Sequence, residues 1–311
     1  MIFDLAIIGG GPAGVAAGVY AARKRLRTVF ITTDFNSQSS VSENIQNWIG
    51  TTSLSGLDLA QNLKKHLLAY ADDVVDVKEG ETAELIKKIG ESASGGNFIV
   101  KTNAAEYATR TVLITSGSQR RKLEIPGAAE FDNKGLTYCA SCDGPLFAGK
   151  DVVVIGGGNA AFETAAQLLA YAKSVTLLNR GNEFKADPIT VENVGKHPNV
   201  KLVKNAIPVR VEGDKFVNAI VYKDAKTGKE IRLGVEGIFV EIGLIPNTYF
   251  VKDIIKLNKY GQIPIDHKTQ MTEVRGIWAA GDNTDGLYHQ NNIAAGDAVK
   301  ALEDIYLHLR T

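Results

Sequence analysis

The sequence predicts an α/β fold made of two Rossmann-like, three-layer dinucleotide-binding domains, the second inserted in the first. Two glycine-rich fingerprints of the form Gly-x-Gly-x-x-Gly/Ala, at residues 9–14 and 156–161, are the main observations. Each follows an apolar strand and precedes a run of helix-forming residues. The length of 311 residues is enough for two domains.

The first fingerprint follows a short buried strand predicted over residues 3–8 and opens a helix predicted over residues 13–23. Gly9 permits the tight turn, Gly11 lets the backbone approach a pyrophosphate, and Gly14 lets the helix pack against the strand. A strand, a glycine turn and a helix N-terminus together form a phosphate-binding cradle.

The same order repeats with a strand over residues 151–155, the turn of residues 156–161 and a helix predicted through Ala172. A third position, Ala280-Gly281-Asp282, ends another strand with a small residue and a carboxylate. One such fingerprint is weak support for a dinucleotide site, but two in the correct strand and helix context are strong.

Two segments, residues 113–117 and 242–247, are predicted to be the crossings between the domains. The first domain then comprises residues 1–116 and 244–311, and the second residues 117–243. Short strands are expected between Gly195 and Val240, a short turn at residues 92–97, and a closing helix from about Asn292 to Arg310.

Composition excludes several classes of function. The 35 Lys and Arg residues balance 35 Asp and Glu residues, so nothing indicates binding to nucleic acid or to an anionic membrane. The N-terminus lacks a positively charged region, and its apolar stretch is broken by glycines, so we expect neither a signal peptide nor a membrane span. With two cysteines there is no disulfide scaffold, and the cytoplasm is the expected compartment.

The two cysteines, Cys139 and Cys142, are three positions apart, a spacing that permits the Cα separation of roughly 5.5 Å that a disulfide needs. Beside two cofactor fingerprints, the pair indicates redox chemistry. The alternative is half of a zinc site, but structural zinc needs four ligands and the five histidines show no metal spacing near the pair, so no metal is expected. A helix starting here would favour the thiolate. Asp143 fits either a helix-start acid or a catalytic acid.

Several motifs together resemble the low-molecular-weight thioredoxin reductases of the two-dinucleotide-binding flavoprotein family. They are residues 9–14, 43–48, 125–127, 139–143, 156–161 and 276–290. The stretches at 142–147 and 237–248 are similar to the flavoprotein subunit of the alkyl hydroperoxide reductase system. That subunit carries an N-terminal thioredoxin-like extension, which we expect to be absent here because the flavin fingerprint begins at residue 9.

The resemblance implies FAD at the first fingerprint and NADPH or NADH at the second. The implied FAD residues are Gly9, Gly11, Pro12, Ala13, Gly14, Thr33, Gln38, Asn47, Gly117, Gly281, Asp282, His289, Gln290 and Asn291. The implied NAD(P)H residues are Gly156, Gly158, Asn159, Ala160, Ala161, Arg180, Lys185 and Gly243. It also implies that Cys142 faces the flavin, that Cys139 attacks the disulfide of the partner, and that Asp143 protonates the leaving thiolate.

Around the flavin the chain departs from the family pattern at three places. Asn36-Ser37 stands where relatives carry two glycines, Thr115-Ser116-Gly117 replaces an Ala-Thr-Gly crossing, and His289 replaces a basic residue. Asn36 tolerates positive φ and Ser116 keeps a hydroxyl, so we still expect FAD to bind. His289 is either a packed residue or one that tunes the site.

The nicotinamide specificity residues also depart from the pattern. An NAD enzyme would present an acid where Asn179 stands, and an NADP enzyme would offer arginines. Arg180 remains, Gly181 replaces a second Arg, and Lys185 replaces a third. The two cations favour NADPH over NADH; a merely solvated loop and a donor other than a nicotinamide are the alternatives.

The predicted function is that of a thioredoxin-disulfide reductase, which moves electrons from NAD(P)H through FAD and the Cys139–Cys142 disulfide to thioredoxin or a similar small redox protein. The alternatives are a reductase of a peroxiredoxin-linked or glutaredoxin-like carrier, and a flavin oxidase or sensor. A homodimer is expected from the family alone. Because the cysteines and the nicotinamide site share one domain and must meet one flavin, we expect a rotation about crossings near Gly117 and Gly243.

Overall fold

The computed structural model describes residues 1–42, 45–92 and 95–310. Residues 43 and 44, which open one of the motifs that carry the family resemblance, lie outside this range. The chain divides into two compact units: one of residues 1–43, 48–119 and 245–311, and one of residues 120–244 with residues 44–47. The unit boundaries at 119/120 and 244/245 lie within three residues of the boundaries expected from the sequence.

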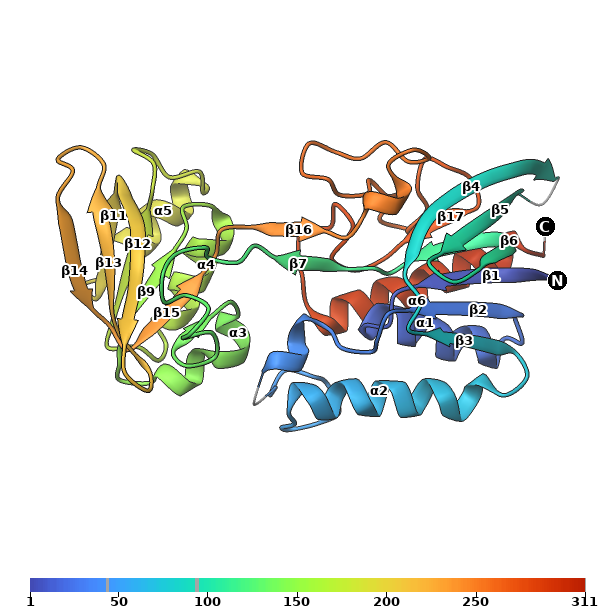
Figure 1. The fold of residues 1–311 in the computed structure, drawn as a ribbon, viewed down its shortest axis with the longest axis horizontal. Helices are drawn as coiled ribbons and strands as arrows, with labels where there is room; N and C mark the ends of the chain where they lie inside the picture. The colour runs from blue at the N-terminus through green and yellow to red at the C-terminus, as the bar shows by residue number, and fades with distance from the viewer. Residues whose placement is uncertain (43–44, 93–94, 311) are drawn as a thin grey trace. The chain divides into compact units, whose positions relative to one another are not determined.

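The first unit is built on a seven-stranded sheet in the order β3-β2-β1-β6-β5-β4, with β17 also paired to β6 (Figure 1). Its strands are β1 (Ile2–Ile8), β2 (Thr28–Thr32), β3 (Val75–Glu79), β4 (Ala83–Ser92), β5 (Gly95–Thr102), β6 (Glu106–Ile114) and β17 (Ile277–Ala279). Strands β3, β2, β1, β6 and β17 run parallel, whereas β4, β5 and β6 form an antiparallel meander.

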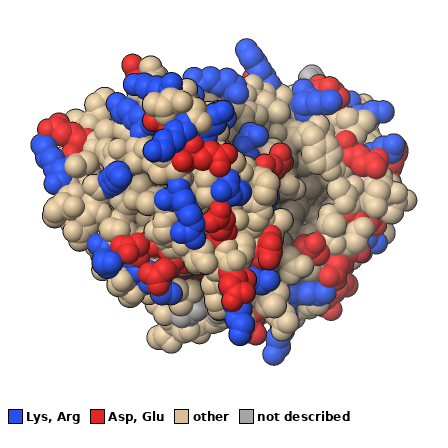
Figure 2. All heavy atoms as spheres, turned by 60° about the vertical axis from the view of Figure 1, so that its left-hand side comes forward, with Lys and Arg blue, Asp and Glu red and all other residues tan. Residues whose placement is uncertain are grey.

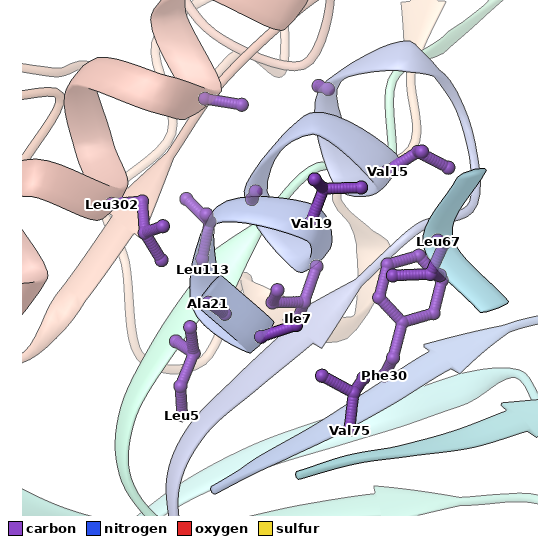
Figure 3. Packing of buried hydrophobic residues seen from close by; sticks show 14 of the residues in the cluster. Leu5, Ile7, Val15, Val19, Ala21, Phe30, Leu67, Val75, Leu113 and Leu302 are labelled. Carbon is purple, nitrogen blue, oxygen red and sulfur yellow. The ribbon is translucent and has the colours of Figure 1, made fainter. Parts of the chain in front are cut away.

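Alternation along β1 explains why this sheet is buried on both faces. Leu5 and Ile7 pack on one side with helices α1 (Pro12–Arg23), α2 (Gly56–Ala71) and α6 (Asn291–His308). Figure 3 shows Leu5 and Ile7 in one buried cluster with Val15 and Val19 of α1 and Leu302 of α6. The intervening Ala6 and Ile8 belong to a second core on the other face. The carboxyl end of β1 is thereby fixed against α1.

The second unit contains a five-stranded parallel sheet in the order β11-β10-β9-β15-β8. Its strands are β8 (Leu136–Thr137), β9 (Asp151–Ile155), β10 (Ser174–Asn179), β11 (Val200–Lys204) and β15 (Gly237–Val240). Helices α3 (Ala140–Asp143), α4 (Asn159–Leu168) and α5 (Pro188–Gly195) accompany it. An antiparallel sheet of β12 (Ala206–Gly213), β13 (Val217–Asp224) and β14 (Glu230–Gly234) completes the unit (Figure 1).

The two chain crossings pair with each other as a small ribbon of β7 (Ser118–Arg120) and β16 (Leu244–Pro246). In the first unit, Ser116 Oγ donates to the backbone carbonyl of Asn247 over 2.6 Å. The side-chain amide of Asn247 donates back to the backbone carbonyl of Ser116 over 2.9 Å. The hydroxyl that Ser116 retains is therefore used to hold the two crossings together.

Three local expectations differ from the structure. Helix α4 ends at Leu168 rather than Ala172, because the N–H groups of Ala170 and Tyr171 bond to carbonyls three residues back, which closes the helix in tight turns. The turn expected at residues 92–97 is wrong for Ser92 and for residues 95–97, which lie in β4 and β5, where Ser92 pairs with Gly95; residues 93 and 94 lie outside the described range. The C-terminal helix covers Asn291–His308, within two residues of the expected span.

No helix among the described residues is both long and apolar enough to span a bilayer. On the face drawn in Figure 2, basic and acidic side chains are interspersed over the surface. This pattern agrees with the balanced composition of the chain.

Candidate active site

The first fingerprint forms a tight turn between β1 and α1. Gly9 has φ +123°, and a Cβ there would lie 2.3 Å from the carbonyl oxygen of Thr115. A Cβ on Gly14 would lie 1.8 Å from the carbonyl oxygen of Gly9, so the third glycine lets α1 pack onto the turn. Gly11 is the N-cap of α1, and around it the nearest heavy atom to such a Cβ is 3.9 Å away. The N-terminus of α1 is thus open for an anion.

A cavity of 480 Å³ lies in front of this turn within the first unit. The residues expected from the sequence that line it are Gly9, Gly11, Pro12, Ala13, Thr33, Gln38, Gly117, Gly281, Asp282 and Asn291. Gly14, Asn47, His289 and Gln290 are not among its lining residues. Gly14 has a packing position instead, and Asn47 is grouped with the other unit.

Asp282 is the centre of the polar wall of this cavity. Gln38 Nε2 donates to Asp282 Oδ2 over 3.1 Å and to Ser118 Oγ over 3.1 Å. His289 Nδ1 lies 3.4 Å from Asp282 Oδ1. His289, although outside the lining, is therefore linked to this wall of the cavity through the carboxylate of Asp282.

Asp34, which was not expected from the sequence, lines the cavity shortly after β2. Its position 20 residues after Gly14 is where a dinucleotide-binding fold places the acid that binds a ribose hydroxyl. The same spacing rule applied to the first fingerprint would have found it. A helix N-terminus for a pyrophosphate and carboxylates at Asp34 and Asp282 fit the donors and acceptors of FAD.

The second fingerprint repeats the turn between β9 and α4. Gly156 has φ +154°, and a Cβ there would meet the carbonyl oxygen of Glu241 at 2.3 Å and the Cβ of Ala161 at 2.9 Å. Gly158, the N-cap of α4, has no heavy atom within 4 Å of such a Cβ. Ala161, fully buried, takes the packing role that Gly14 has in the first fingerprint.

The specificity loop, residues 180–185, begins where β10 ends. Arg180 and Lys185 are both exposed, and the N–H of Lys185 donates to the carbonyl of Gly157 over 2.7 Å. Asn179 is buried, and its amide donates to the carbonyls of Gly181 and Glu183 over 3.2 and 2.7 Å. The structure thus ties the backbone of Lys185 to the second fingerprint, and Arg180 directly follows β10.

Cys139 and Cys142 form a disulfide with a Cα–Cα distance of 5.4 Å. Cys139 is the N-cap of the one-turn helix α3, and the N–H of Cys142 lies 3.2 Å from Cys139 Sγ. Both cysteines are half-buried. Within the described residues there is no group of three or more His, Cys, Asp or Glu side chains arranged for a metal ion.

Asp143 is held beside the disulfide by Thr137. The hydroxyl of Thr137 donates to Asp143 Oδ2 and accepts the N–H of Cys139 over 3.3 Å. Next along the chain, Tyr138 accepts the N–H of Leu123 over 3.3 Å, and burial raises the pKa of its phenol. Thr137, which contacts both Asp143 and Cys139, was not singled out from the sequence.

In the second unit, the residues of the second fingerprint, the specificity loop and the disulfide all lie just after neighbouring parallel strands. Asn179 ends β10, Gly156 follows β9, Glu241 follows β15 and Cys139 lies just after β8. Because the carboxyl ends of parallel strands share one edge of the sheet, the nucleotide fingerprint and the disulfide belong to the same edge.

Glu241 is a largely buried carboxyl group on that edge, with 12% of its side chain exposed, and it was not identified from the sequence. Thr164 Oγ1 donates to Glu241 Oε1 over 2.9 Å, and Arg120 Nη1 lies 3.7 Å from Glu241 Oε2. Burial raises the pKa of Glu241, an effect that Arg120 and Thr164 oppose. The sequence offers no motif for it, because both partners are distant along the chain.

The model of the pyridine nucleotide-disulphide oxidoreductase family matches residues 3–298. The chain belongs to this family. Membership confirms the predicted fold class and makes the chain an oxidoreductase, and the family implies a flavin and a nicotinamide nucleotide.

Solved structures of thioredoxin reductases resemble the chain over its whole length. A thioredoxin reductase from Streptococcus pyogenes is 30% identical with a TM-score of 0.87, covering 99% of this chain and 98% of that one. A thioredoxin reductase from Giardia duodenalis is 30% identical with a TM-score of 0.89, covering 99% of both chains. These neighbours confirm the resemblance to thioredoxin reductases.

The curated relatives carry other names. An NADH dehydrogenase from Bacillus subtilis is 39% identical over 299 residues, covering 96% of this chain and 57% of its own length. A subunit of alkyl hydroperoxide reductase from Pseudomonas putida is 38% identical over 309 residues, covering 99% of this chain and 58% of its own length. The chain therefore spans little more than half the length of these relatives.

Proposed function

We propose that the protein is a flavin-dependent disulfide reductase that takes electrons from NAD(P)H and delivers them through the Cys139–Cys142 disulfide to thioredoxin or a similar small redox protein. The observation that carries this proposal is the disulfide itself, half-buried on the sheet edge that also bears the second fingerprint. A disulfide closed over three residues with an adjacent carboxyl group suits exchange chemistry better than a structural staple.

The cavity of the first unit would hold FAD, with its pyrophosphate at the N-terminus of α1 and its hydroxyl groups on Asp34 and Asp282. The N-terminus of α4 and the loop of residues 180–185 would hold the nicotinamide nucleotide. Bound FAD supplies the chemistry that links a two-electron hydride donor to a disulfide acceptor.

The chain's own residues then carry the exchange with the protein substrate. In the reduced pair, the Cys139 thiolate attacks a sulfur of the partner disulfide, and a mixed disulfide forms while one partner sulfur leaves as a thiolate. Asp143, held by Thr137, donates the proton that this leaving sulfur takes up. Cys142 then attacks Cys139 Sγ, which releases the second partner thiolate and restores the Cys139–Cys142 disulfide.

Rotation between the two units at the crossings remains part of this proposal. Gly117 has φ +63° and Gly243 has φ +105°, and neither has a heavy atom within 4 Å of the place where a Cβ would stand. Glycine is therefore favoured at these positions by the positive φ of the backbone, and not by close packing of neighbouring atoms. This is the property expected of residues that absorb a change in dihedral angles.

A second candidate is the reduction of a peroxiredoxin-linked or glutaredoxin-like carrier. The observation that favours it is the 38% identity to a subunit of alkyl hydroperoxide reductase. A panel of purified carriers distinguishes the two proposals: turnover with thioredoxin supports the first, and turnover only with another carrier supports the second. A homodimer in the cytoplasm is proposed from the family alone.

The experiment that tests the function is an anaerobic titration with NADPH and, separately, with NADH, followed by the loss of flavin absorbance. Bleaching by NADPH alone would support a phosphate clamp made by Arg180 and Lys185, whereas a preference for NADH would favour the hydroperoxide-type alternative. Bleaching by neither would refute the nicotinamide assignment. Replacing Cys142 by Ser should abolish protein-disulfide reduction, whereas an oxidase would keep consuming oxygen at the same rate in this variant.

A further inference from the structure

Asn179 stands where a dinucleotide-binding fold that selects NAD places an acid, yet its side chain is turned inward. Its amide nitrogen donates to the backbone carbonyls of Gly181 and Glu183. We propose that Asn179 is a specificity-determining residue: it folds the 180–185 loop so that cations, and no acid, meet the 2′ position of the bound adenosine. The inference rests on the proposed nicotinamide site and names its ligand class, a 2′-phosphorylated adenosine.

An aspartate could not replace Asn179 in this arrangement. The amide serves two carbonyl acceptors, one of them at 2.7 Å, and a carboxylate has no proton to donate to either. Carboxylate oxygens placed against these carbonyls would be repelled. The loop would then open, and the acid would turn toward the ribose.

Asn179 also couples the loop to the second fingerprint. A Cβ on Gly157 would lie 2.3 Å from Asn179 Oδ1, so the absence of a side chain at Gly157 lets the two residues stack closely. The carbonyl of Gly157 accepts the N–H of Lys185. A change at residue 179 therefore moves the loop relative to the residues that would bind the pyrophosphate.

The charges around the loop favour an anion. Arg180 and Lys185 are exposed, and Lys204, which pairs with Asn179 across β10 and β11, lies 5.2 Å above the ring of Phe184. Phe184 packs in turn on Phe162 of α4, with ring centroids 5.0 Å apart. These contacts anchor the loop and add a third cation beside it.

Glu183 is the acid within the loop, and its backbone carbonyl is the acceptor that Asn179 binds most closely. Its side chain is exposed. Glu183→Gln is therefore the matched control, because it removes the nearby acid and leaves the hydrogen bonds of Asn179 in place.

The test compares two probes that differ only by the 2′-phosphate, 2′,5′-ADP and 5′-AMP, by calorimetric titration of the flavin-loaded protein. We expect the native chain to bind 2′,5′-ADP at least about tenfold more tightly, since a charge-assisted contact contributes roughly that factor. Asn179→Asp should lower this ratio by about tenfold or more, the effect of losing such contacts. Asn179→Ser, which is too short to reach both carbonyls, should lower it in the same direction, and Glu183→Gln should not lower it.

An unchanged ratio in both Asn179 variants, with flavin content and melting temperature equal to those of the native chain, would overturn the inference. A ratio that falls in Arg180→Gln but in neither Asn179 variant would overturn it as well, because the cation would then act without the loop tie. If the native chain binds neither probe, the proposed nicotinamide site fails, and this inference fails with it. If the native chain binds both probes, the nicotinamide site stands, and an unchanged ratio in the Asn179 variants then counts against the role of Asn179 alone.

Discussion

The hydroxyl of Thr137 donates a hydrogen bond to the carboxylate of Asp143 while it accepts the N–H of Cys139. One side chain at the end of β8 thus orients the proposed proton donor and the first residue of the redox pair together.

Thr137→Val should slow disulfide exchange with the protein substrate by about tenfold, because the carboxyl group loses its orientation. Thr137→Ser keeps the hydroxyl and should restore most of the rate. The measurement is the rate of substrate reduction as a function of pH, with flavin reduction by the nicotinamide as the control. Equal pH profiles for the Val and Ser variants would show that Thr137 does not position Asp143.

Asp143→Asn should lower the rate of exchange by about a hundredfold, the lower end of what general acid catalysis contributes. Formation of the Cys139–Cys142 disulfide should not change, because the two cysteines hold each other's geometry without this carboxyl group. The rate is measured in single-turnover exchange with a disulfide substrate. A loss of less than about twofold would remove Asp143 from the proton step.

Gly14→Ala should destabilise the first unit by about 3 kcal/mol or more and abolish flavin binding, because its Cβ would meet the carbonyl oxygen of Gly9 at 1.8 Å. Gly11→Ala is the matched control for the stability of the flavin-free protein, since its Cβ meets no protein atom closer than 3.9 Å and its φ of −75° suits alanine. Thermal unfolding and flavin content measure both effects. Similar melting temperatures for the two variants would contradict the packing role of Gly14.

Stability should depend on pH through Glu241. Its raised pKa in the folded state means that, above its ordinary value of 4.5, the folded chain holds a proton that the unfolded chain releases. The free energy of unfolding therefore falls as the pH rises through this window, and the contribution is present at low pH. Glu241→Gln should flatten that dependence, as measured by denaturant unfolding between pH 4.5 and neutrality. An equal slope for native and variant protein would show that Glu241 is not the titrating group.

Gly117→Ala and Gly243→Ala test the crossings. Both positions have positive φ, at +63° and +105°, where alanine is strained by about 1–2 kcal/mol. If these residues absorb a rotation, turnover should fall in both variants. In Gly243→Ala, which lies outside the lining of the flavin cavity, the flavin content should stay unchanged. A disulfide lock between the two units that left turnover intact would refute the rotation.

The parts of the site that depend on neighbouring residues along the chain are predictable from the sequence. The glycine turns, the helices that follow them and the disulfide follow from local spacing, as Gly9, Gly14 and the pair at residues 139 and 142 illustrate. Gln38 and Asp282 were also expected in one site, and they are hydrogen-bonded across 244 positions. That pairing came from the resemblance to a family.

Other parts depend on which strands become neighbours. Glu241 is paired with Thr164 and Arg120, which no local pattern links to it. In the sequence, Thr137 is typical of an ordinary strand residue. Only in the folded chain does α3 place Asp143 beside its hydroxyl. The hairpin of β4 and β5 was missed because its glycines are typical of a turn, although the ladder continues through them. These features arise from tertiary pairing, which overrides local propensity.

The central claim is that the Cys139–Cys142 disulfide lies on the electron path, and counting reducing equivalents tests it most directly. In an anaerobic titration with NADPH or NADH, the native protein should take up about two equivalents before the flavin is fully bleached, one for the flavin and one for the disulfide. A variant with both cysteines replaced by serine should take up about one. If the native protein also takes up one equivalent and its cysteines stay oxidised, the disulfide does not accept the electrons and the central claim is wrong.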